Sequence, residues 1–546
     1  MWSNKVLLLG ILTFCNFIIP NLAETPTDTA SQAIEILQQN CGSSGCHGGP
    51  GGYRFNVHDP GSLLTAKVVE PGNAAASELI QRVEAGIMPL GGYQRQRGVK
   101  LPVQDIRVLR AWIDSGAQVP TRSIRARHRF ISEAEALASI VRDLEFTSEA
   151  DRSYLRYFSL ANVWNNAEIE TSELELYPVA IGKLVNHLSW RREITPPRRL
   201  GVEGALLRID LRDYDWTPEM WLSILRSYPY AAASRDLTDQ IDRIETLSGV
   251  RVPYIRADWF IAAASTPPLY HTILRLPNTL ADLESLLLVD TEFDLQHNLA
   301  RRFGLINSGV SRNNRAMERH ATVYGAYWKS FDFSGNNPEQ NIFRNPLDLR
   351  ADGGEVIFHL PNGLQGYFIV DRLGRRIDEA PVNIVRDKTN PDDPVVRNGR
   401  SCMGCHVKGM NAFRDEVGGA VDARAQALFD IDRARSLYAG QPELDRLLDA
   451  DNRRFAGALA HMGNAIPKGS DDEPVSRLAR KYEAPLSAAQ AAADLYIEDA
   501  NALQQRVAAS PELQIEGLDQ LLGAKASIKR DAWEHGFGLA RFLTAP

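Results

Sequence analysis

The alternation of hydrophobic and polar positions predicts helices over much of the chain. One helix is predicted over residues 31–39, where Ile34 and Leu37 share a face, and another over residues 106–113, which Gly116 ends. Residues 132–143, 148–163, 487–508 and 532–542 are also predicted as helices, as is a segment that begins at Thr217-Pro218. The pattern therefore indicates a mainly helical chain.

Shorter segments have the period-two pattern of strands. Residues 207–212 alternate between apolar and polar side chains, which predicts a strand. Residues 355–360 and 364–370 flank the turn sequence at 361–363, which predicts a β-hairpin. The expected fold class is therefore mainly α, with a large, mostly helical middle region that holds a small antiparallel β-sheet.

The first residues have the features of a secretory signal peptide. Lys5 provides the positive charge, residues 6–14 are an apolar run too short to span a bilayer, and Ala23 is a small residue suited to cleavage. Cys15 offers a lipid anchor as the alternative, although a large residue precedes it. No later stretch reaches the roughly 18 apolar residues of a transmembrane helix. The expectation is a periplasmic or secreted protein with no transmembrane segment in the mature chain.

The net charge of the chain bears on which binding partners are expected. The 546-residue chain has a formal net charge of −7, and removal of a signal containing Lys5 and no acid makes it −8. A mildly acidic chain gives no electrostatic reason to expect nucleic acid as a partner. A basic redox protein is a more natural partner, although the charge does not require one.

The cysteines carry the most specific signal. Of five in the chain, four remain after the signal peptide, as two local pairs that each precede a histidine directly. Cys402, Cys405 and His406 form C-x-x-C-H, the attachment signature of c-type haem. Two thiols one helical turn apart can add to the porphyrin vinyl groups, and the adjacent histidine can bind the iron. The alternatives are a zinc site, which needs two more ligands, and a redox dithiol, which is expected in a βαβ pattern.

The other pair has a wider spacing. Cys41, Cys46 and His47 form C-x₄-C-H, in which the intervening residues must loop out for both thiols to reach one haem. A disulfide beside an uninvolved histidine is the alternative. Met88 lies downstream in Gly86-Ile87-Met88-Pro89, between the two predicted N-terminal helices. Helix, haem motif, methionine loop and closing helix occur in this order in a small class I cytochrome c.

Residues 31–120 resemble the planctomycete-type cytochrome c domain. The resemblance implies a class I-like fold in which His47 and Met88 are the axial ligands, and it covers under a fifth of the chain. The four-residue gap between the cysteines departs from that family, so attachment through Cys41 is less secure than through Cys46. The matching segments are Cys46-His47-Gly48, Ser62-Leu63-Leu64, Ile87-Met88-Pro89 and residues 109–117.

The sequence predicts four segments over the whole chain, and the last of them contains the second motif. Residues 1–23 are the expected signal peptide, 24–125 the cytochrome c domain, 126–350 a mixed, mostly helical middle domain, and 351–546 the hairpin with a helical C-terminal haem region. The hairpin and second motif together resemble uncharacterised multi-domain dihaem cytochromes. The two Cys/His motifs predict the cofactors, which are two covalently bound haem c groups.

The sixth ligand of the second haem stays open. Met462, His461 and His320 are candidates, and so is an empty coordination position. His320 lies in a Glu318-Arg319-His320 cluster near aromatic residues, for which a packed aromatic core with a hydrogen-bonded histidine and a surface ion pair is the preferred interpretation. Histidines 187, 271, 297 and 359 lack ligand spacing and are interpreted as structural.

Three hypotheses for function follow. The first is a periplasmic dihaem cytochrome that transfers electrons with a redox protein partner, and the higher potential is expected at the methionine-ligated haem. The second is a peroxidase- or oxygenase-like haem enzyme with an open coordination position at the second haem. The third is the electron-accepting subunit of a dehydrogenase. No nucleophile elbow, P-loop or dinucleotide fingerprint is found in a convincing context.

Overall fold

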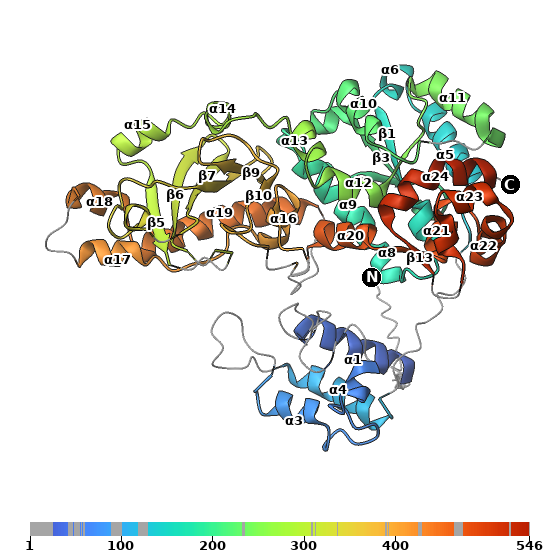
Figure 1. Cartoon of the computed structure of the whole chain (residues 1–546), viewed down its shortest axis with the longest axis horizontal. Helices are drawn as coiled ribbons and strands as arrows, with labels where there is room; N and C mark the ends of the chain where they lie inside the picture. Colours follow the sequence, from blue (N-terminus) through green and yellow to red (C-terminus); the bar gives the residue numbers. More distant parts are fainter. Residues whose placement is uncertain are drawn as a thin grey trace, which may run out of the picture. The chain divides into compact units, whose positions relative to one another are not determined.

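The chain is described by a computed structural model in which it divides into two compact units, Met1–Ser123 and Ile124–Pro546 (Figure 1). The description covers residues 26–41, 47, 55, 57, 61–88, 101–117, 129–231, 235–306, 310–311, 313–335, 337–387, 390, 393–423, 429–462, 473–523 and 526–544. The predicted signal peptide and Cys46 lie outside these residues.

Unit 1 is helical in its described part. Its helices are α1 (Pro26–Cys41), α2 (Gly61–Thr65), α3 (Glu78–Glu84) and α4 (Val103–Asp114). The first and last of these pack against each other, with Leu37 of α1 and Leu109 and Trp112 of α4 buried in one core. Gly116, at φ +104°, ends the last helix, as the sequence predicted. The two predicted N-terminal helices are confirmed.

Unit 2 begins with a lobe in which helices surround a small sheet. Its four-stranded sheet has the order β2-β3-β1-β4, and its fourth strand is parallel to its neighbour. The strands are β1 (Leu155–Ser159), β2 (Arg198–Leu200), β3 (Leu206–Asp210) and β4 (Ile255–Arg256). The main helices are α5 (Glu133–Phe146), α6 (Glu149–Arg152), α7 (Ala161–Asn165), α8 (Thr171–Leu174), α9 (Leu176–His187), α10 (Pro218–Arg226), α11 (Thr238–Ser248), α12 (Ala257–Ala264) and α13 (Leu269–Ile273).

The second lobe of unit 2 contains a five-stranded antiparallel sheet in the sequential order β5-β6-β7-β8-β9 (Figure 1). The strands are β5 (Arg301–Leu305), β6 (Arg315–Thr322), β7 (Gly325–Asp332), β8 (Gly353–His359) and β9 (Gln365–Asp371). Because this sheet joins strands from both sides of residue 350, the middle and C-terminal regions share one core. The neighbouring helices and strands are α14 (Leu280–Leu286), α15 (Thr291–Gln296), β10 (Glu379–Ala380), β11 (Val396–Arg397), α16 (Arg400–Cys405), α17 (Val417–Asp422), α18 (Ile431–Leu437) and α19 (Gln441–His461).

The C-terminal helices return to the first lobe, whose core holds their apolar side chains (Figure 1). They are α20 (Pro474–Glu483), α21 (Ala488–Asp494), α22 (Ala500–Ala509), α23 (Pro511–Ile515) and α24 (Arg530–Thr544), with a two-stranded sheet of β12 (Leu486–Ser487) and β13 (Ser527–Ile528). α20 packs against α9, α12 and α16, so it joins the first lobe to the helix that carries Cys402. In the described part of the chain, no helix has the length and apolar character needed to cross a membrane.

The prediction of a mainly α fold was wrong. The described residues form four sheets, of five, four, two and two strands, so the chain is an α/β mixture. Residues 148–163 were expected to form one helix, but they contain α6, β1 and α7. All five residues of β1 are buried, and the strand pairs with β3 and β4. Pairing with distant strands overrides the local preference for helix.

The register of the five-stranded sheet separates its two faces. Arg319, Trp328, Ile357 and Tyr367 stand opposite one another on successive strands, so their side chains share one face, which we call the motif face. Asp451 of α19 accepts hydrogen bonds from Arg319 and from the indole N–H of Trp328, so α19 covers this face. His320 belongs to the opposite face, where α14 and α15 contribute Glu284 and Asp294.

Candidate functional site

The second predicted haem motif lies on a short helix whose start is tightly constrained. Gly399 precedes α16 with φ +90°, and a Cβ atom there would lie 2.6 Å from the carbonyl oxygen of Ser265 and 2.8 Å from the ring of Tyr270. Only glycine tolerates both the left-handed backbone and this approach. Cys402 and Cys405 follow three residues apart, so their side chains point from the same face of α16.

His406 follows α16 directly and is held by its own loop. Its Nδ1 atom lies 3.0 Å from the carbonyl oxygen of Gly409. A carbonyl can only accept, so Nδ1 carries the proton and Nε2 keeps its lone pair. Burial lowers the pKa of His406 to about 4, so the ring is neutral near pH 7. This is the form in which imidazole binds a metal, with the Nδ1–H bonded to a backbone carbonyl in the usual way.

The two thiols are in a different chemical state from that of reactive cysteines. Burial raises the pKa of Cys405 to about 12 and the pKa of Cys402 well above its usual value. Zinc binding and dithiol exchange both use thiolates, which need a lowered pKa. Among the described residues, Cys402, Cys405 and His406 are also not joined by the further ligand that a structural zinc site would need. A pair of neutral thiols on one helical face followed by a histidine is compatible with the attachment of a haem.

Three buried aromatic rings line the site beside Cys402. The ring of Tyr367 lies 6.2 Å from that of His406, and the ring of His187 stacks on Tyr367 at 5.5 Å. The hydroxyl of Tyr270 accepts the backbone N–H of Tyr367 and lies 3.2 Å from Nε2 of His187. The phenol groups of Tyr270 and Tyr367 both interact electrostatically with the Cys402 thiol. His187, interpreted from the sequence as structural, thus belongs to the surroundings of the motif.

The loop after His406 is clamped by α19. The side-chain amide of Asn452 accepts the backbone N–H of Met410 at 2.7 Å and donates to its carbonyl at 2.9 Å. Gly409, at φ +104°, approaches Asn452 so closely that a Cβ atom would lie 2.4 Å from Oδ1. Because Gly409 provides the acceptor for His406, this clamp sets the orientation of the imidazole.

The first predicted haem site is described only in part, because Cys46 lies outside the described residues. Cys41 is the last residue of α1, and its carbonyl accepts the backbone N–H of His47 at 3.2 Å. The ring of His47 stacks on Phe55 with a centroid distance of 4.0 Å, and its buried Nδ1 has no hydrogen-bond partner in the described structure. Met88 is half-buried in the loop after α3. A histidine with an unused ring nitrogen is compatible with a ligand role.

The candidate sixth ligands of the second haem differ in their availability. His320 is fully buried between two carboxylates, with Nδ1 2.8 Å from Asp294 and Nε2 3.0 Å from Glu318. It also lies on the sheet face opposite Tyr367, so His320 is not placed to bind the second haem. The expected hydrogen-bonded histidine is present, but the expected surface ion pair is buried instead: the Glu318 side chain is 2% exposed and pairs with Arg302 at 2.6 Å. His461 is exposed at the end of α19, and Met462, the next residue, packs partly against the core.

A buried charged group on the motif face was missed at the sequence level. Arg315 of β6 binds Asp332 of β7 through two N–H groups, and its Nη2 lies 2.9 Å from Oε2 of Glu355 on β8. Glu355 interacts electrostatically with both motif thiols, and Arg315 with His406. No local spacing signals this group, because strand pairing alone brings the three residues together.

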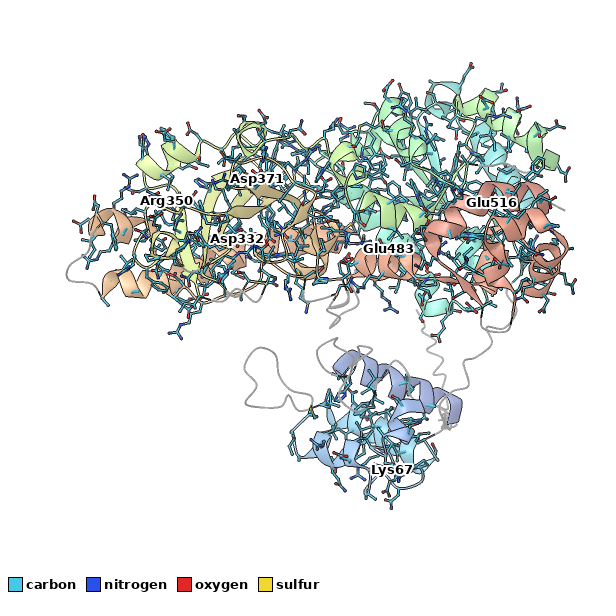
Figure 2. The ribbon with its side chains drawn as sticks, in the orientation of Figure 1. Lys67, Asp332, Arg350, Asp371, Glu483 and Glu516 are labelled. Atoms are coloured by element: carbon cyan, nitrogen blue, oxygen red, sulfur yellow. The ribbon has the colours of Figure 1, made fainter. Side chains whose placement is uncertain are left out.

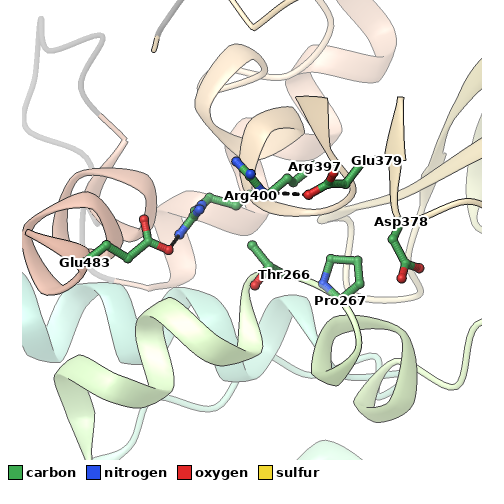
Figure 3. Close-up of a pocket in the computed structure, with 7 residues that line it drawn as sticks. All are labelled: Thr266, Pro267, Asp378, Glu379, Arg397, Arg400 and Glu483. Carbon is green, nitrogen blue, oxygen red and sulfur yellow. Dashed lines mark hydrogen bonds and ion pairs between the residues drawn. The ribbon is translucent and has the colours of Figure 1, made fainter. Parts of the chain in front are cut away.

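A pocket of about 430 Å³ opens beside the start of the motif helix (Figure 3). Arg400, the first residue of α16, lines it and binds Glu483 at 2.5 Å, while Arg397 binds Glu379 at 2.9 Å. Asp378, also in the lining, lies 3.4 Å from Nδ1 of the buried His271. Solvent therefore reaches the N-terminal end of α16 through a lining whose charges are largely paired.

Comparison with protein families, with curated proteins and with solved structures finds no match for this chain. Among the side chains that the structure describes, no group of three or more histidine, cysteine, aspartate or glutamate residues is placed to hold a metal ion by itself.

Proposed function

We propose that this chain is a periplasmic c-type cytochrome that carries two covalently bound haem groups and transfers electrons with a redox protein partner. Cys402 and Cys405 would hold one haem with His406 as the proximal ligand, and Cys41 and Cys46 the other with His47 and Met88. The haem supplies a one-electron iron couple. The chain supplies attachment, one or two axial ligands and the surrounding field.

The hydrogen bond from His406 to Gly409 carries this proposal. It sets the ring in the tautomer that leaves Nε2 for iron, directly after two neutral thiols on one helical face. A donor bond at Nδ1 makes the imidazole a stronger ligand, which favours ferric iron. Methionine ligation raises the potential at the other site. Electrons are therefore expected to pass from the C-terminal haem to the N-terminal haem.

The test is expression of the full chain in a host that attaches c-type haem, followed by pyridine haemochrome quantitation and peptide mass spectrometry. Two haems per chain are expected, one of them on the peptide with Cys402 and Cys405. Cys402→Ser with Cys405→Ser should remove one haem, and His406→Ala should alter the visible spectrum of that haem by removing its proximal ligand. His535→Ala, at a histidine side chain that is 82% exposed, is the matched control. A full chain that binds no haem contradicts the proposal.

A further inference from the structure

The two buried carboxylates beside Arg315 on the motif face receive unequal numbers of hydrogen bonds. Arg315 donates to both carboxylate oxygens of Asp332, and Asp332 also accepts the hydroxyl of Ser330 at 2.7 Å. Glu355 receives only one of the guanidinium N–H groups, at 2.9 Å. Asp332 and Glu355 thus share the guanidinium of Arg315, which donates two hydrogen bonds to Asp332 and one to Glu355. Asp332 is labelled in Figure 2, within the lobe that contains the five-stranded sheet.

The position of Glu355 in the sheet places it beside the predicted haem site. Glu355 of β8 pairs with Ile369 of β9, and the next pair on the same face of the sheet is Ile357 with Tyr367. The ring of Tyr367 in turn contacts His406. The Glu355 side chain is 17% exposed, Asp332 is 3% exposed and Arg315 is 9% exposed. Charge in so sheltered a place is weakly screened by water, so electrostatic effects between these groups are strong.

Charged side chains from other strands and from a loop act on Glu355. Arg315 from β6 favours its ionised form, whereas Asp332 from β7 and Asp387 from the segment after β10 oppose it. Desolvation also opposes ionisation, and the combined effect raises the pKa of Glu355. The sulfur atoms of Cys402 and Cys405 from α16 add no charge, because each would be a thioether in the haem-loaded chain. Glu355 therefore combines a raised pKa with a single hydrogen bond from Arg315, and both favour its acting as a proton acceptor.

We propose that Glu355 is the proton-accepting residue of the C-terminal haem site, so that electron uptake there is coupled to proton uptake. This inference rests on the proposed function. An electron delivered by the redox partner lowers the charge of the site by one. The Glu355 carboxylate then takes one proton from solvent and becomes a carboxylic acid that keeps its place beside Arg315. Loss of the electron returns the proton to solvent, so charge and atoms balance in both directions.

The proposal predicts a specific dependence of the midpoint potential on pH. Above the pKa of Glu355 in the oxidised protein and below its pKa in the reduced protein, one proton accompanies each electron. The equilibrium constant for reduction then falls tenfold per pH unit, which is about 59 mV for a one-electron couple. Outside that interval the potential is independent of pH. The pH-dependent interval is expected to begin above the ordinary pKa of a glutamate, because burial and the neighbouring carboxylates raise it.

The experiment is a spectroelectrochemical titration of the full haem-loaded chain at several pH values. Two midpoint potentials are expected, one for each haem. The potential that is the same in His47→Ala and in the wild type is assigned to the C-terminal site. Glu355→Gln should abolish the pH dependence at that site, and Asp387→Asn should move it to lower pH by removing a charge that opposes ionisation. Glu145→Gln is the matched control, because Glu145 also pairs with an arginine, Arg243 at 2.7 Å, but is 46% exposed.

The outcomes separate this inference from the proposed function. A chain without haem at Cys402 and Cys405 contradicts the proposed function itself. A chain with that haem and a pH-independent potential in the wild type overturns the role of Glu355, and this measurement needs no variant to fold. A pH dependence that persists unchanged in Glu355→Gln also overturns it.

Discussion

The Nδ1 atom of His406 lies 3.0 Å from the carbonyl oxygen of Gly409, three residues further along the chain. This contact decides which ring nitrogen is free. It exists because Gly409 adopts φ +104° and because Asn452 binds the backbone of the next residue on both its N–H and its carbonyl. The orientation of His406 therefore depends on a residue of α19 more than forty positions away.

Asn452→Ala should loosen this arrangement. It removes both hydrogen bonds to Met410 and leaves two sheltered backbone groups without partners, at an expected cost of about 1–3 kcal/mol. The haem at Cys402 and Cys405 should also show a broader or partly high-spin electron paramagnetic resonance spectrum, because the orientation of His406 is less constrained. Asn501→Ala, at an exposed helix start, should change neither the unfolding midpoint nor the spectrum by much. An unaltered spectrum in Asn452→Ala would show that the clamp does not position His406.

Gly399→Ala should destabilise unit 2 by about 1–3 kcal/mol, because a Cβ atom at φ +90° meets backbone of Ser265 and the ring of Tyr270. The yield of haem attached at Cys402 should fall with it. Gly538→Ala, within α24, meets nothing within 4 Å and should stabilise by about 0.5–1 kcal/mol. Urea unfolding of both variants measures the difference, and equal midpoints would refute the assigned constraint.

Lys183 and Glu473 form an ion pair that is 2% and 1% exposed, with a distance of 2.8 Å. Lys183→Met leaves the carboxylate buried and unpaired, so we expect a loss of about 3–5 kcal/mol in the free energy of unfolding. The double variant with Glu473→Gln should lose less than the two single variants together. Arg251→Met, which breaks an exposed pair with Glu245, should cost at most about 1 kcal/mol. Additive losses in the double variant would contradict coupling between the buried pair.

Stability should fall on mild acidification. Burial lowers the pKa of His187 to about 3, against about 6.5 in an unfolded chain. Between these values the unfolded state binds the proton and the folded state does not, so the free energy of unfolding decreases as pH falls below about 6.5. The slope from this residue is at most about 1.4 kcal/mol per pH unit. His187→Gln should flatten the dependence between pH 7 and pH 4, whereas His535→Gln should leave it unchanged. An equal slope in His187→Gln would show that His187 is not buried in its neutral form.

The two axial positions can be tested by spectroscopy. Met88→Ala should remove the methionine-to-iron charge-transfer band and lower the potential of the N-terminal haem. Met462→Ala tests the corresponding position at the C-terminal haem, and His320→Gln should leave both haem spectra unaltered because both ring nitrogens face carboxylates. If cyanide or peroxide alters the C-terminal haem of the wild type, its sixth position is open and the haem-enzyme alternative gains support.

Elements with local signals could be predicted from the sequence. The hairpin around residues 361–363 and the helix capped by Thr217 both occur where they were expected, because a turn sequence and a capping hydroxyl act within a few residues. Residues 487–508 were expected to form one helix but break between α21 and α22. Tyr496 lies in the break at φ +57°, with its hydroxyl 2.8 Å from that of Tyr254. A contact across 242 positions has no local signature.

The sequence by itself determined the spacing of Cys402, Cys405 and His406, on which the proposed haem attachment rests, because positions along a covalent chain do not depend on how the rest of the chain folds. The tertiary structure alone decided the surroundings of that motif. Strand register brings Glu355 to Arg315 and turns His320 to the other face, and packing of α19 selects the free nitrogen of His406. Pairing and burial depend on which distant segments meet, so the residues that set the charge and orientation of the site could not be read from their neighbours in the chain.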